Sequence, residues 1–250
     1  MITLKSPREI EVMARAGRIV AATLALMRET VRAGLTTEDL DAAAEKFIRS
    51  HDGATPSFKG LYGFPKTLCT SIDLEIVHGI PSHRRVLAEG SIVSVDVGVQ
   101  LEGLHADSAT TIAVGEIGPE TQRLLKVTQE SLAAGIAQAR VGNHVGDIGH
   151  AVQAVAEGAG FGVVRELVGH GIGTRFHEEP QVPNYGTPRR GPRLLEGMTL
   201  AIEPMITIGS PVTRTLSDKW TVVTADGSLA AHFEHTVAIT AAGPRILTTL

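Results

Sequence analysis

The pattern of an apolar strand that ends in a carboxylate occurs once in each half of this chain. Residues 89–96 read Glu-Gly-Ser-Ile-Val-Ser-Val-Asp and residues 196–203 read Glu-Gly-Met-Thr-Leu-Ala-Ile-Glu, so a turn, a strand and an acid follow one another in both. The tripeptide His-Gly-Ile also recurs, at 78–80 and 170–172, but at a different offset. Unequal offsets indicate a diverged duplication with a shifted loop. We therefore expect two related halves that share one fold.

Each half also contains two helical patterns ahead of its strands. In the first half these lie over 6–27, where a Ser-Pro-Arg-Glu capping box places proline at the first helical position, and over 36–53, where the helix starts on one of two threonines. In the second half they lie over 119–136 and about 147–158. We therefore expect each half to form two helices and then strands that end in acids.

Length and composition favour one shared core. A chain of 250 residues with 43% hydrophobic residues can bury a substantial core, and one α/β domain of this size is ordinary. No Pro/Ser-rich linker, low-complexity block or long charge run divides the chain. The sequence therefore predicts a single mixed α/β (α+β) domain over 1–250, with pseudo-symmetric halves of about 1–115 and 116–250.

The hairpin expected over 91–114 brings two acids together. Valines alternate along its first strand, so Asp96 points away from the apolar face. If Val99 pairs with Leu104, Asp96 lies directly opposite Asp107, at a Cβ separation of about 4.5–5.5 Å. Like charges at that distance destabilise a sheet. Taken alone, the pair predicts either a cation between the two carboxylates or a solvated face.

Five side chains of metal-binding type stand at the ends of β-rich or Gly-rich runs in both halves: Asp96, Asp107, His170, Glu203 and Glu234. Four carboxylates and one imidazole suit hard or borderline divalent ions. Burying four carboxylates together without cations would be prohibitive. The sequence therefore predicts a metal centre assembled from both halves of one fold.

Composition and charge exclude several classes of protein. The formal net charge is −4 and no stripe of basic residues with interleaved aromatics occurs, so we expect no nucleic-acid partner. The longest apolar stretch, 19–27, is well short of the roughly 20 residues of a membrane span, and no secretory pattern opens the chain. One cysteine, Cys69, fits a reducing compartment. We therefore expect a cytoplasmic protein, and a monomer because no coiled-coil pattern or large apolar patch is apparent.

Six motifs of this chain together resemble those of the type I methionine aminopeptidases, in the same order and at similar spacing over nearly the whole length. These motifs are His78-Gly79-Ile80-Pro81, the pair Asp96 and Asp107, Gly169-His170-Gly171-Ile172-Gly173, Phe176-His177-Glu178-Glu179-Pro180, Ala201-Ile202-Glu203-Pro204, and Phe233-Glu234-His235-Thr236. The short interval between His170 and Glu203 resembles the short bacterial form of that family more than the type II form with its inserted subdomain.

The resemblance implies a pita-bread (creatinase/aminopeptidase) fold, in which pseudo-two-fold halves form a curved antiparallel sheet backed by helices. It also implies a metal-dependent hydrolase that removes the initiator methionine from nascent polypeptides when the second residue is small. The implied partners are nascent N-termini that begin with methionine, and contact with the ribosome is a further candidate that the sequence leaves open.

The resemblance also implies two divalent metal ions in the central cleft, from among cobalt, manganese, iron and zinc. One would be held by Asp96, Asp107 and Glu234, and the other by Asp107, His170, Glu203 and Glu234. Two close cations can lower the pKa of a water between them toward neutrality and polarise a scissile carbonyl. Glu203 would accept the proton of that water, because it is the nearest carboxylate.

Two further histidines fall inside the matched motifs. The resemblance implies that His78 and His177 hydrogen-bond the scissile amide and the developing oxyanion of the substrate. We expect the neighbouring carboxylates of Glu178 and Glu179 to raise the basicity of His177. Taken singly, each of these histidines would be a structural or surface residue. The others are expected to be surface or packing residues, or to lie on the strand face opposite the ligands: His51, His83, His105, His144, His150, His232 and His235.

Selection of methionine needs an apolar slot, and aromatic or sulfur-bearing side chains suit a thioether. The positions that match the family's slot are Phe64, Cys69, His78, Phe176 and Trp220, together with Phe58 and Leu61, which we interpret as ordinary core residues. The chain departs from the family at Phe58 and Leu61, where cysteine and tyrosine are frequent, and at Asp73 and Val77, where asparagine and cysteine are usual. Some relatives bind a monovalent cation near Asp73, but nothing in this sequence requires one.

Two other functions remain open from the sequence. Proline-specific aminopeptidases and dipeptidases share the fold and the five ligands, but they usually carry an additional N-terminal domain, whereas the first ligand of this chain is already at position 96. Catalytically silent pita-bread proteins act as binding modules. They typically lose ligands, whereas this chain retains all five.

Overall fold

The computed structural model describes residues 2–250, which form four α-helices, one short 3-10 helix and mostly antiparallel strands. The helices are α1 (Pro7–Thr30), α2 (Thr37–Arg49), η1 (Leu61–Gly63), α3 (Pro119–Gln138) and α4 (Val145–Gly158). The strands are β1 (Thr55–Pro56), β2 (Leu68–Ile72), β3 (Glu75–Val77), β4 (Ile92–Leu101), β5 (Leu104–Ala113), β6 (Gly162–Val163), β7 (Gly169–Gly171), β8 (Glu178–Val182), β9 (Thr199–Ile202), β10 (Met205–Thr207), β11 (Thr213–Thr215), β12 (Val222–Thr224), β13 (Ala230–His232), β14 (His235–Thr240) and β15 (Gly243–Ile246).

The helices begin where the capping residues predicted. The Ser6 hydroxyl accepts a hydrogen bond from the backbone of Glu9, and the Glu9 carboxylate accepts one from the Ser6 backbone at 2.7 Å. Thr36 caps α2 in the same reciprocal way. Helix α4 begins two residues before the predicted start, because the Asp147 carboxylate accepts a hydrogen bond from the backbone of His144 and so caps the helix earlier.

The register of the β4–β5 hairpin differs from the prediction. The two strands are joined by the two-residue turn Glu102–Gly103, with φ of 50° and 79°, where a longer turn was expected. Such a turn matches the twist of the strands it joins. As a result Asp107 pairs with Gly98, and Asp96 is not directly opposite Asp107. The observed pairing is shifted by two residues from the predicted one, and an even shift leaves both carboxylates on one face of the hairpin.

The strands form two main antiparallel sheets, one for each half. Strands β1, β4 and β2 lie side by side with β5 paired to β4, and the second sheet has the order β15-β14-β9-β7-β8. The halves meet where β5 runs beside residues 234–236. The Glu234 backbone donates to the Ala109 carbonyl at 3.0 Å. The Thr236 hydroxyl bonds both backbone groups of Asp107, at 2.9 and 2.8 Å.

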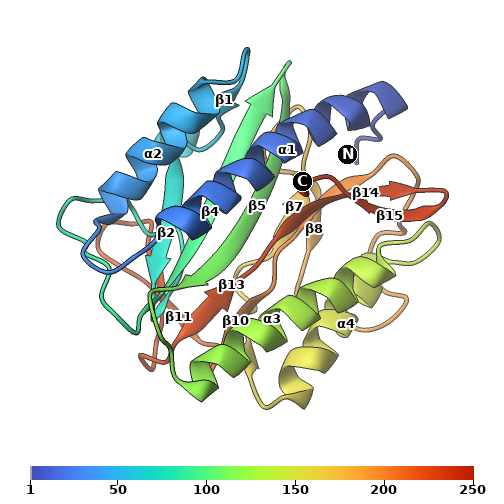
Figure 1. Cartoon of the computed structure of the whole chain (residues 1–250). Helices are drawn as coiled ribbons and strands as arrows, with labels where there is room; N and C mark the ends of the chain where they lie inside the picture. Colours follow the sequence, from blue (N-terminus) through green and yellow to red (C-terminus); the bar gives the residue numbers. More distant parts are fainter. Residues whose placement is uncertain (1) are drawn as a thin grey trace.

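The helix pairs cover the same side of this curved arrangement, as Figure 1 shows. Helix α1 packs on β4 and β5, and α3 packs on α4 and on strands of the second half. The hairpin valines at 93, 95, 97 and 99 are fully buried beneath α1 and α2. Asp96 alternates with them, so its carboxylate lies on the side of the sheet away from the helices.

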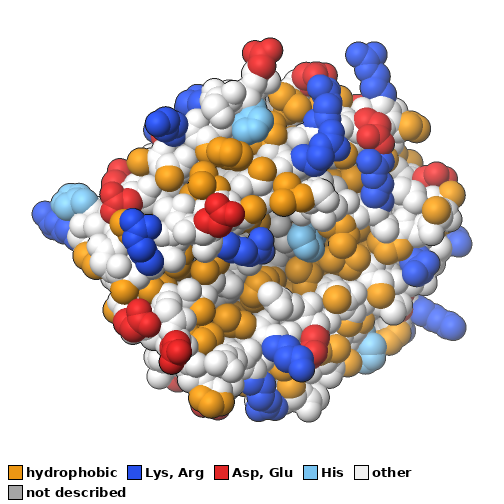
Figure 2. All heavy atoms as spheres, in the orientation of Figure 1, with side chains coloured by type: hydrophobic (Ala, Val, Ile, Leu, Met, Phe, Trp, Pro, Cys, Tyr) orange, Lys and Arg blue, Asp and Glu red, His pale blue; other side chains and the backbone are white. Residues whose placement is uncertain are grey.

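The helix-covered face is hollowed between α1 and α3, where Figure 2 shows hydrophobic side chains gathered. A cavity of about 610 Å³ lies there, and its walls include Leu24 from α1 and Leu132 from α3. Within residues 2–250, no helix is both long and apolar enough to cross a membrane.

Candidate metal centre

The five predicted ligands come from five separate segments that converge in one cleft. Asp96 and Asp107 lie within the paired strands β4 and β5, and His170 lies in β7. Glu203 directly follows β9, and Glu234 directly precedes β14. All five line one cavity of about 330 Å³.

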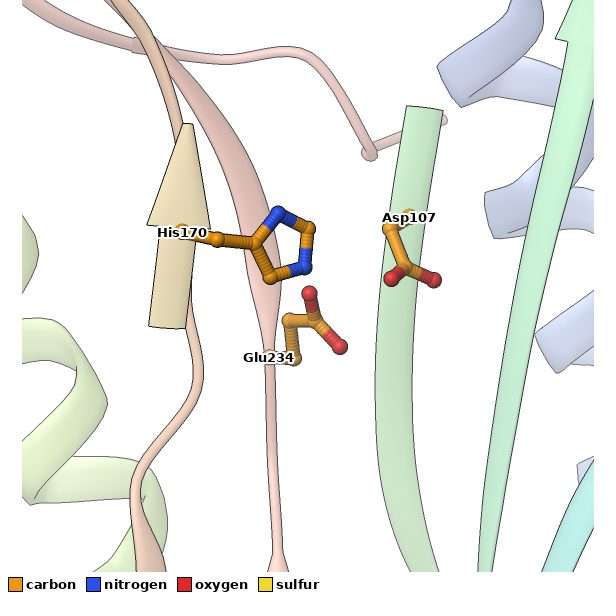
Figure 3. Close-up of side chains that lie close together, drawn as sticks. All are labelled: Asp107, His170 and Glu234. Carbon is orange, nitrogen blue, oxygen red and sulfur yellow. The ribbon is translucent and has the colours of Figure 1, made fainter. Parts of the chain in front are cut away.

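The closest part of the cluster joins residues from both halves. One ligand atom from each of Asp107, His170 and Glu234 lies within 4.8 Å of the other two. Figure 3 shows the His170 imidazole and the two carboxylates turned toward the same space. The Nε2 atom of His170 also lies 3.8 Å from a carboxylate oxygen of Glu203. This spacing is short enough for several side chains to reach one ion.

The carboxylates of the cluster are held away from water. The exposed fraction is 3% for Asp107 and 1% for Glu234. Burial, together with the charge of Glu203, raises the pKa of Asp107 to about 8, and burial raises the pKa of Glu203 to about 8. Burial, followed by the neighbouring acids, raises the pKa of Asp96 and of Glu234 well above the usual range. Ionising these carboxylates together is therefore unfavourable in free energy, and a bound cation would offset that repulsion.

Three carboxylate oxygens in this cluster have no hydrogen-bond partner among residues 2–250. They are Oδ1 of Asp96, Oδ1 of Asp107 and Oε1 of Glu234. A buried acceptor without a donor is costly, and such groups in native proteins usually have a partner. Oxygen donors with one imidazole fit divalent ions such as Mn²⁺, Fe²⁺, Co²⁺ or Zn²⁺. The residues present therefore fit a divalent metal.

The orientation of His170 suits this interpretation. Its Nδ1 atom lies 2.8 Å from the Gly171 carbonyl, so a proton on Nδ1 leaves the lone pair of Nε2 directed at the acids. Burial, and secondarily the neighbouring His177, lower the pKa of His170 to about 3. The imidazole is therefore neutral near pH 7, as a metal ligand must be.

His232 lies beside two acids of this cluster, so its interpretation as a surface or packing residue is wrong. Its Nε2 atom lies 3.5 Å from Glu203 and 3.9 Å from Glu234, and the three residues form a second group of potential ligands. Neither ring nitrogen has a hydrogen-bond partner among the described residues. Burial lowers the pKa of His232 to about 3. The spacing of two residues from Glu234 could have revealed this, because alternating residues share a strand face.

His78 and His177 line the same cavity as the acids. His78 has a φ of 60°, and burial, followed by His232 and His177, lowers the pKa of His78 to about 4. The expected rise in the basicity of His177 is wrong, because burial lowers the pKa of His177. The Glu178 carboxylate is paired instead with Lys5, at 2.5 Å.

The apolar wall of the cavity contains more residues than the sequence indicated. The predicted residues Phe64, Cys69, Phe176 and Trp220 all line it. The interpretation of Phe58 and Leu61 as ordinary core residues needs correction, because both line the cavity as well as packing in the core. Lining residues that sequence reasoning missed are Tyr62, Val77, Glu166, Leu167, Val168 and Met205.

The other histidines do not line the cavity. The placement of His105 on the face opposite Asp107 is wrong, because the two residues are two positions apart on one strand and alternation puts both on one face. Its ring lies edge-on to Phe176 with centroids 5.7 Å apart, and its Nδ1 atom bonds Ser57 at 2.9 Å. His235 bonds Thr248 at 2.8 Å, away from the acids.

Comparison with known proteins adds independent information. The model of metallopeptidase family M24 matches residues 11–241. The chain is 54% identical to a methionine aminopeptidase of Clostridium acetobutylicum and 51% identical to methionine aminopeptidase 1 of Bacillus subtilis, with 99% of both chains covered in each case.

Solved structures show the same likeness. A crystal structure of methionine aminopeptidase from Thermotoga maritima matches with a TM-score of 0.98 at 44% identity, over 100% of both chains. Prolidase from Pyrococcus furiosus matches with a TM-score of 0.77 at 21% identity, over 99% of this chain and 65% of that one, which is a likeness of fold alone. The fold class predicted from the sequence is confirmed.

Proposed function

The chain belongs to metallopeptidase family M24, and we propose that it is a methionine aminopeptidase of type I, which removes the N-terminal methionine from polypeptides whose second residue is small. The observation that carries this proposal is one cavity of about 330 Å³ with a buried acid cluster on one side and an apolar wall on the other. Ligand sites of this kind combine an apolar slot with a few converging polar groups. A methionine side chain and its peptide bond need these two surfaces together.

We assign two divalent ions to each chain, from among manganese, iron, cobalt and zinc. Asp96, Asp107 and Glu234 would hold one, and Asp107, His170, Glu203 and Glu234 would hold the other. This division follows the family resemblance, and it is supported by the unpartnered oxygens of Asp96, Asp107 and Glu234. The chemistry such ions supply is the activation of a water near neutral pH and the polarisation of the scissile carbonyl.

Glu203 is the residue we assign to proton transfer. It is more exposed than the other acids of the cluster, and its carboxylate lies between His170 and His232. A carboxylate within hydrogen-bond reach of the attacking water can accept its proton and later return it. Glu203 would therefore take the proton of the attacking water and pass it to the leaving amine.

His78 and His177 are assigned to the substrate's peptide group. Both imidazoles line the cavity, and burial lowers the pKa of each, so they are neutral N–H donors near pH 7. Donors fixed in place before the reaction stabilise charge that develops on the carbonyl oxygen. His177 is held by stacking on Tyr62, with centroids 5.7 Å apart, and by edge contact with His170.

The methionine slot is assigned to the aromatic wall. Phe58 meets Phe176 edge-to-face with centroids 5.3 Å apart, and Phe64 meets Trp220 in the same manner at 5.1 Å. Cys69 completes this wall, and burial raises the pKa of its thiol well above the usual range, so it remains an apolar contact rather than a nucleophile. Rings and sulfur together favour a thioether ligand.

We also propose that residues 1–250 act as a single catalytic domain, monomeric and cytoplasmic, on nascent polypeptides that begin with methionine, with the ribosome as a further candidate partner. A proline-specific peptidase is the main competing function. It is supported only by a likeness of fold at about one-fifth identity, whereas the methionine aminopeptidases match at about half identity over their full length.

One peptide assay tests the proposal. The purified protein is loaded with Mn²⁺ or Co²⁺ and incubated with Met-Ala-Ser, with Met-Trp-Ser and with an Ala-Pro peptide. We expect free methionine from Met-Ala-Ser only, since a small second residue is required. Cleavage confined to the Ala-Pro peptide would establish a proline-specific enzyme, and metal binding without any hydrolysis would establish a binding module.

A further inference from the structure

A buried ion pair joins the segment before α1 to the segment that carries His177. The Nζ atom of Lys5 lies 2.5 Å from an oxygen of Glu178, and the two side chains are 3% and 2% exposed. Taking two charges out of water costs free energy that a single contact rarely repays, so such a pair needs further hydrogen bonds to both partners. The surroundings of Lys5 and Glu178 supply them.

Lys5 is fixed by its backbone as well as its ammonium group. Its backbone N–H donates to the Gly197 carbonyl at 2.7 Å, and its Nζ also donates to the Thr3 carbonyl at 3.3 Å. Ser6, the next residue, is the N-cap of α1. The lysine is therefore anchored between the start of α1 and the turn before β9, so its ammonium position is set by two rigid elements.

Glu178 closes the turn that precedes it. While its Oε2 atom accepts from Lys5, its Oε1 atom accepts from the Arg175 backbone at 3.1 Å and from the Thr174 hydroxyl at 3.3 Å. The turn begins at Gly173, where a Cβ atom would lie 2.3 Å from Cε of Lys5 and 2.7 Å from Oε1 of Glu178. A glycine at this position leaves the space that the lysine fills.

The same turn presents two residues to the proposed active site. Phe176 and His177 lie between Arg175 and Glu178, and both line the cavity. Phe176 contacts His170 with ring centroids 5.5 Å apart, and His177 contacts His170 at 4.4 Å. Any shift of the turn would therefore move both rings relative to the acid cluster.

We propose that Lys5 is a positioning residue, which acts through Glu178 to hold the 173–178 turn and thereby fixes Phe176 and His177 in the cavity. This role rests on the proposed function, because His177 contacts a substrate only if the protein is a peptidase. Lys5 touches neither the cavity nor the ligands. Its effect is on geometry, so its loss should lower the rate of the chemical step through His177 and weaken substrate binding through Phe176, while the metal content should not change.

The test compares Lys5→Met with Arg245→Met. The second variant also removes a cation that ties the region of α1 to the second half, but its partner Glu11 is exposed and distant from the cavity. A misplacement of about 1 Å in an active site can cost on the order of 100-fold in rate, so we expect Lys5→Met to lower kcat by about 10- to 100-fold through His177, and to raise KM as well, because Phe176 moves with the same turn. Arg245→Met should leave both constants unchanged.

Two further measurements do not depend on turnover. Amide hydrogen exchange should rise by about tenfold in the peptide that covers 173–178 of Lys5→Met, with no matching rise in the β4–β5 hairpin, because only the local restraint is lost. Bound metal per chain, measured by calorimetric titration with Mn²⁺, should equal that of the unsubstituted protein.

Lys5→Met leaves Glu178 buried without its partner, so a double variant, Lys5→Met with Glu178→Met, removes both charges and protects the test against a failure to fold. We expect the double variant to unfold at a higher temperature than Lys5→Met and yet to keep the low kcat. Recovery of kcat together with stability would overturn the proposal, because only packing would then matter.

The outcomes separate this proposal from the proposed function. If the unsubstituted protein releases no methionine but local exchange rises in Lys5→Met, the peptidase assignment fails and the restraint on the turn stands. If the unsubstituted protein is active and Lys5→Met changes neither kcat nor exchange at 173–178, the positioning role is wrong. A uniform rise in exchange over the whole chain would also refute it, because Lys5 would then only stabilise the fold.

Discussion

The Nε2 atom of His232 lies 3.5 Å from an oxygen of Glu203, inside the acid cluster. The imidazole is 1% exposed and neutral near pH 7, because burial lowers the pKa of His232 to about 3. We expect a neutral ring at that distance to orient the carboxylate that we assign to proton transfer. Loss of such a supporting partner typically costs about 10- to 100-fold, so His232→Leu should lower kcat by that factor at saturating metal.

The matched variant for this prediction is His232→Gln, which keeps a side-chain N–H and should retain most of the activity. His51→Leu, at the end of α2 and outside the cavity, controls for the loss of any histidine. If His232→Leu binds one ion fewer than the unsubstituted protein in a Mn²⁺ titration, His232 is a ligand and the positioning interpretation is wrong.

Replacement of Glu203 by glutamine keeps the shape of the side chain and removes its charge and its basicity. General-base catalysis contributes about 10²- to 10⁴-fold, so we expect Glu203→Gln to lower the rate of methionine release by at least the lower value. Glu196→Gln, in the exposed turn ahead of β9, is the control and should be fully active. Substantial activity in Glu203→Gln would remove this residue from the mechanism.

The metal-free protein should be less stable at pH 8 than at pH 5. Asp107 and Glu203 have folded-state pKa values of about 8, above the values of about 4 in an unfolded chain. The unfolded chain loses these protons first as pH rises, so stability falls from about pH 4 to about pH 8 and then levels off.

A divalent cation replaces those protons, so it binds more tightly as pH rises over the same interval. The melting temperature is measured with EDTA and with Mn²⁺ from pH 5 to pH 8. We expect the gap between the two series to widen as pH rises. A constant gap would show that the acids are not protonated in the metal-free fold.

Gly98 has no side chain, and this leaves room for the Phe176 and Phe58 rings of the aromatic wall. A Cβ atom at Gly98 would lie 2.8 Å from the Phe176 ring and 3.0 Å from the Phe58 ring, so Gly98→Ala must displace at least one of them. Overpacking of this kind costs about 1–3 kcal/mol, and we expect KM for Met-Ala-Ser to rise by about tenfold or more. Gly118→Ala is the control, because a Cβ there meets nothing within 4 Å. Equal KM values in the two variants would show that the wall does not bind the substrate.

Local sequence patterns were sufficient to predict the helices and the direction of the acids. Ser6 and Thr36 mark the starts of their helices, because an N-cap residue exchanges hydrogen bonds with the residue three positions later in the sequence. The direction of Asp96 follows from the valines on either side of it. The grouping of ligands from both halves was predicted from the carboxylates and the histidine at the ends of β-rich or Gly-rich runs in each half. The division of these ligands between two ions came from the family resemblance.

The errors arose where the outcome depends on contacts between distant segments or on exact turn length. The position of Asp107 opposite Gly98 depends on a turn of two residues, and the sequence also permitted a longer one. Glu178 does not raise the pKa of His177, because its carboxylate is paired with Lys5, which lies 173 residues away in the sequence. His232 was missed because its partner Glu203 lies in a segment distant in sequence, directly after β9.

The hydrogen bonds between β5 and residues 234–236 hold the two halves together beside the acid cluster. The Thr236 hydroxyl accepts from the Asp107 backbone N–H and donates to the Asp107 carbonyl, and the Glu234 backbone N–H donates to the Ala109 carbonyl, so these bonds set the spacing of Asp107 and Glu234. We therefore expect a divalent ion to meet carboxylates whose separation is set by the backbone, so that its binding and release would not require the two halves to move apart.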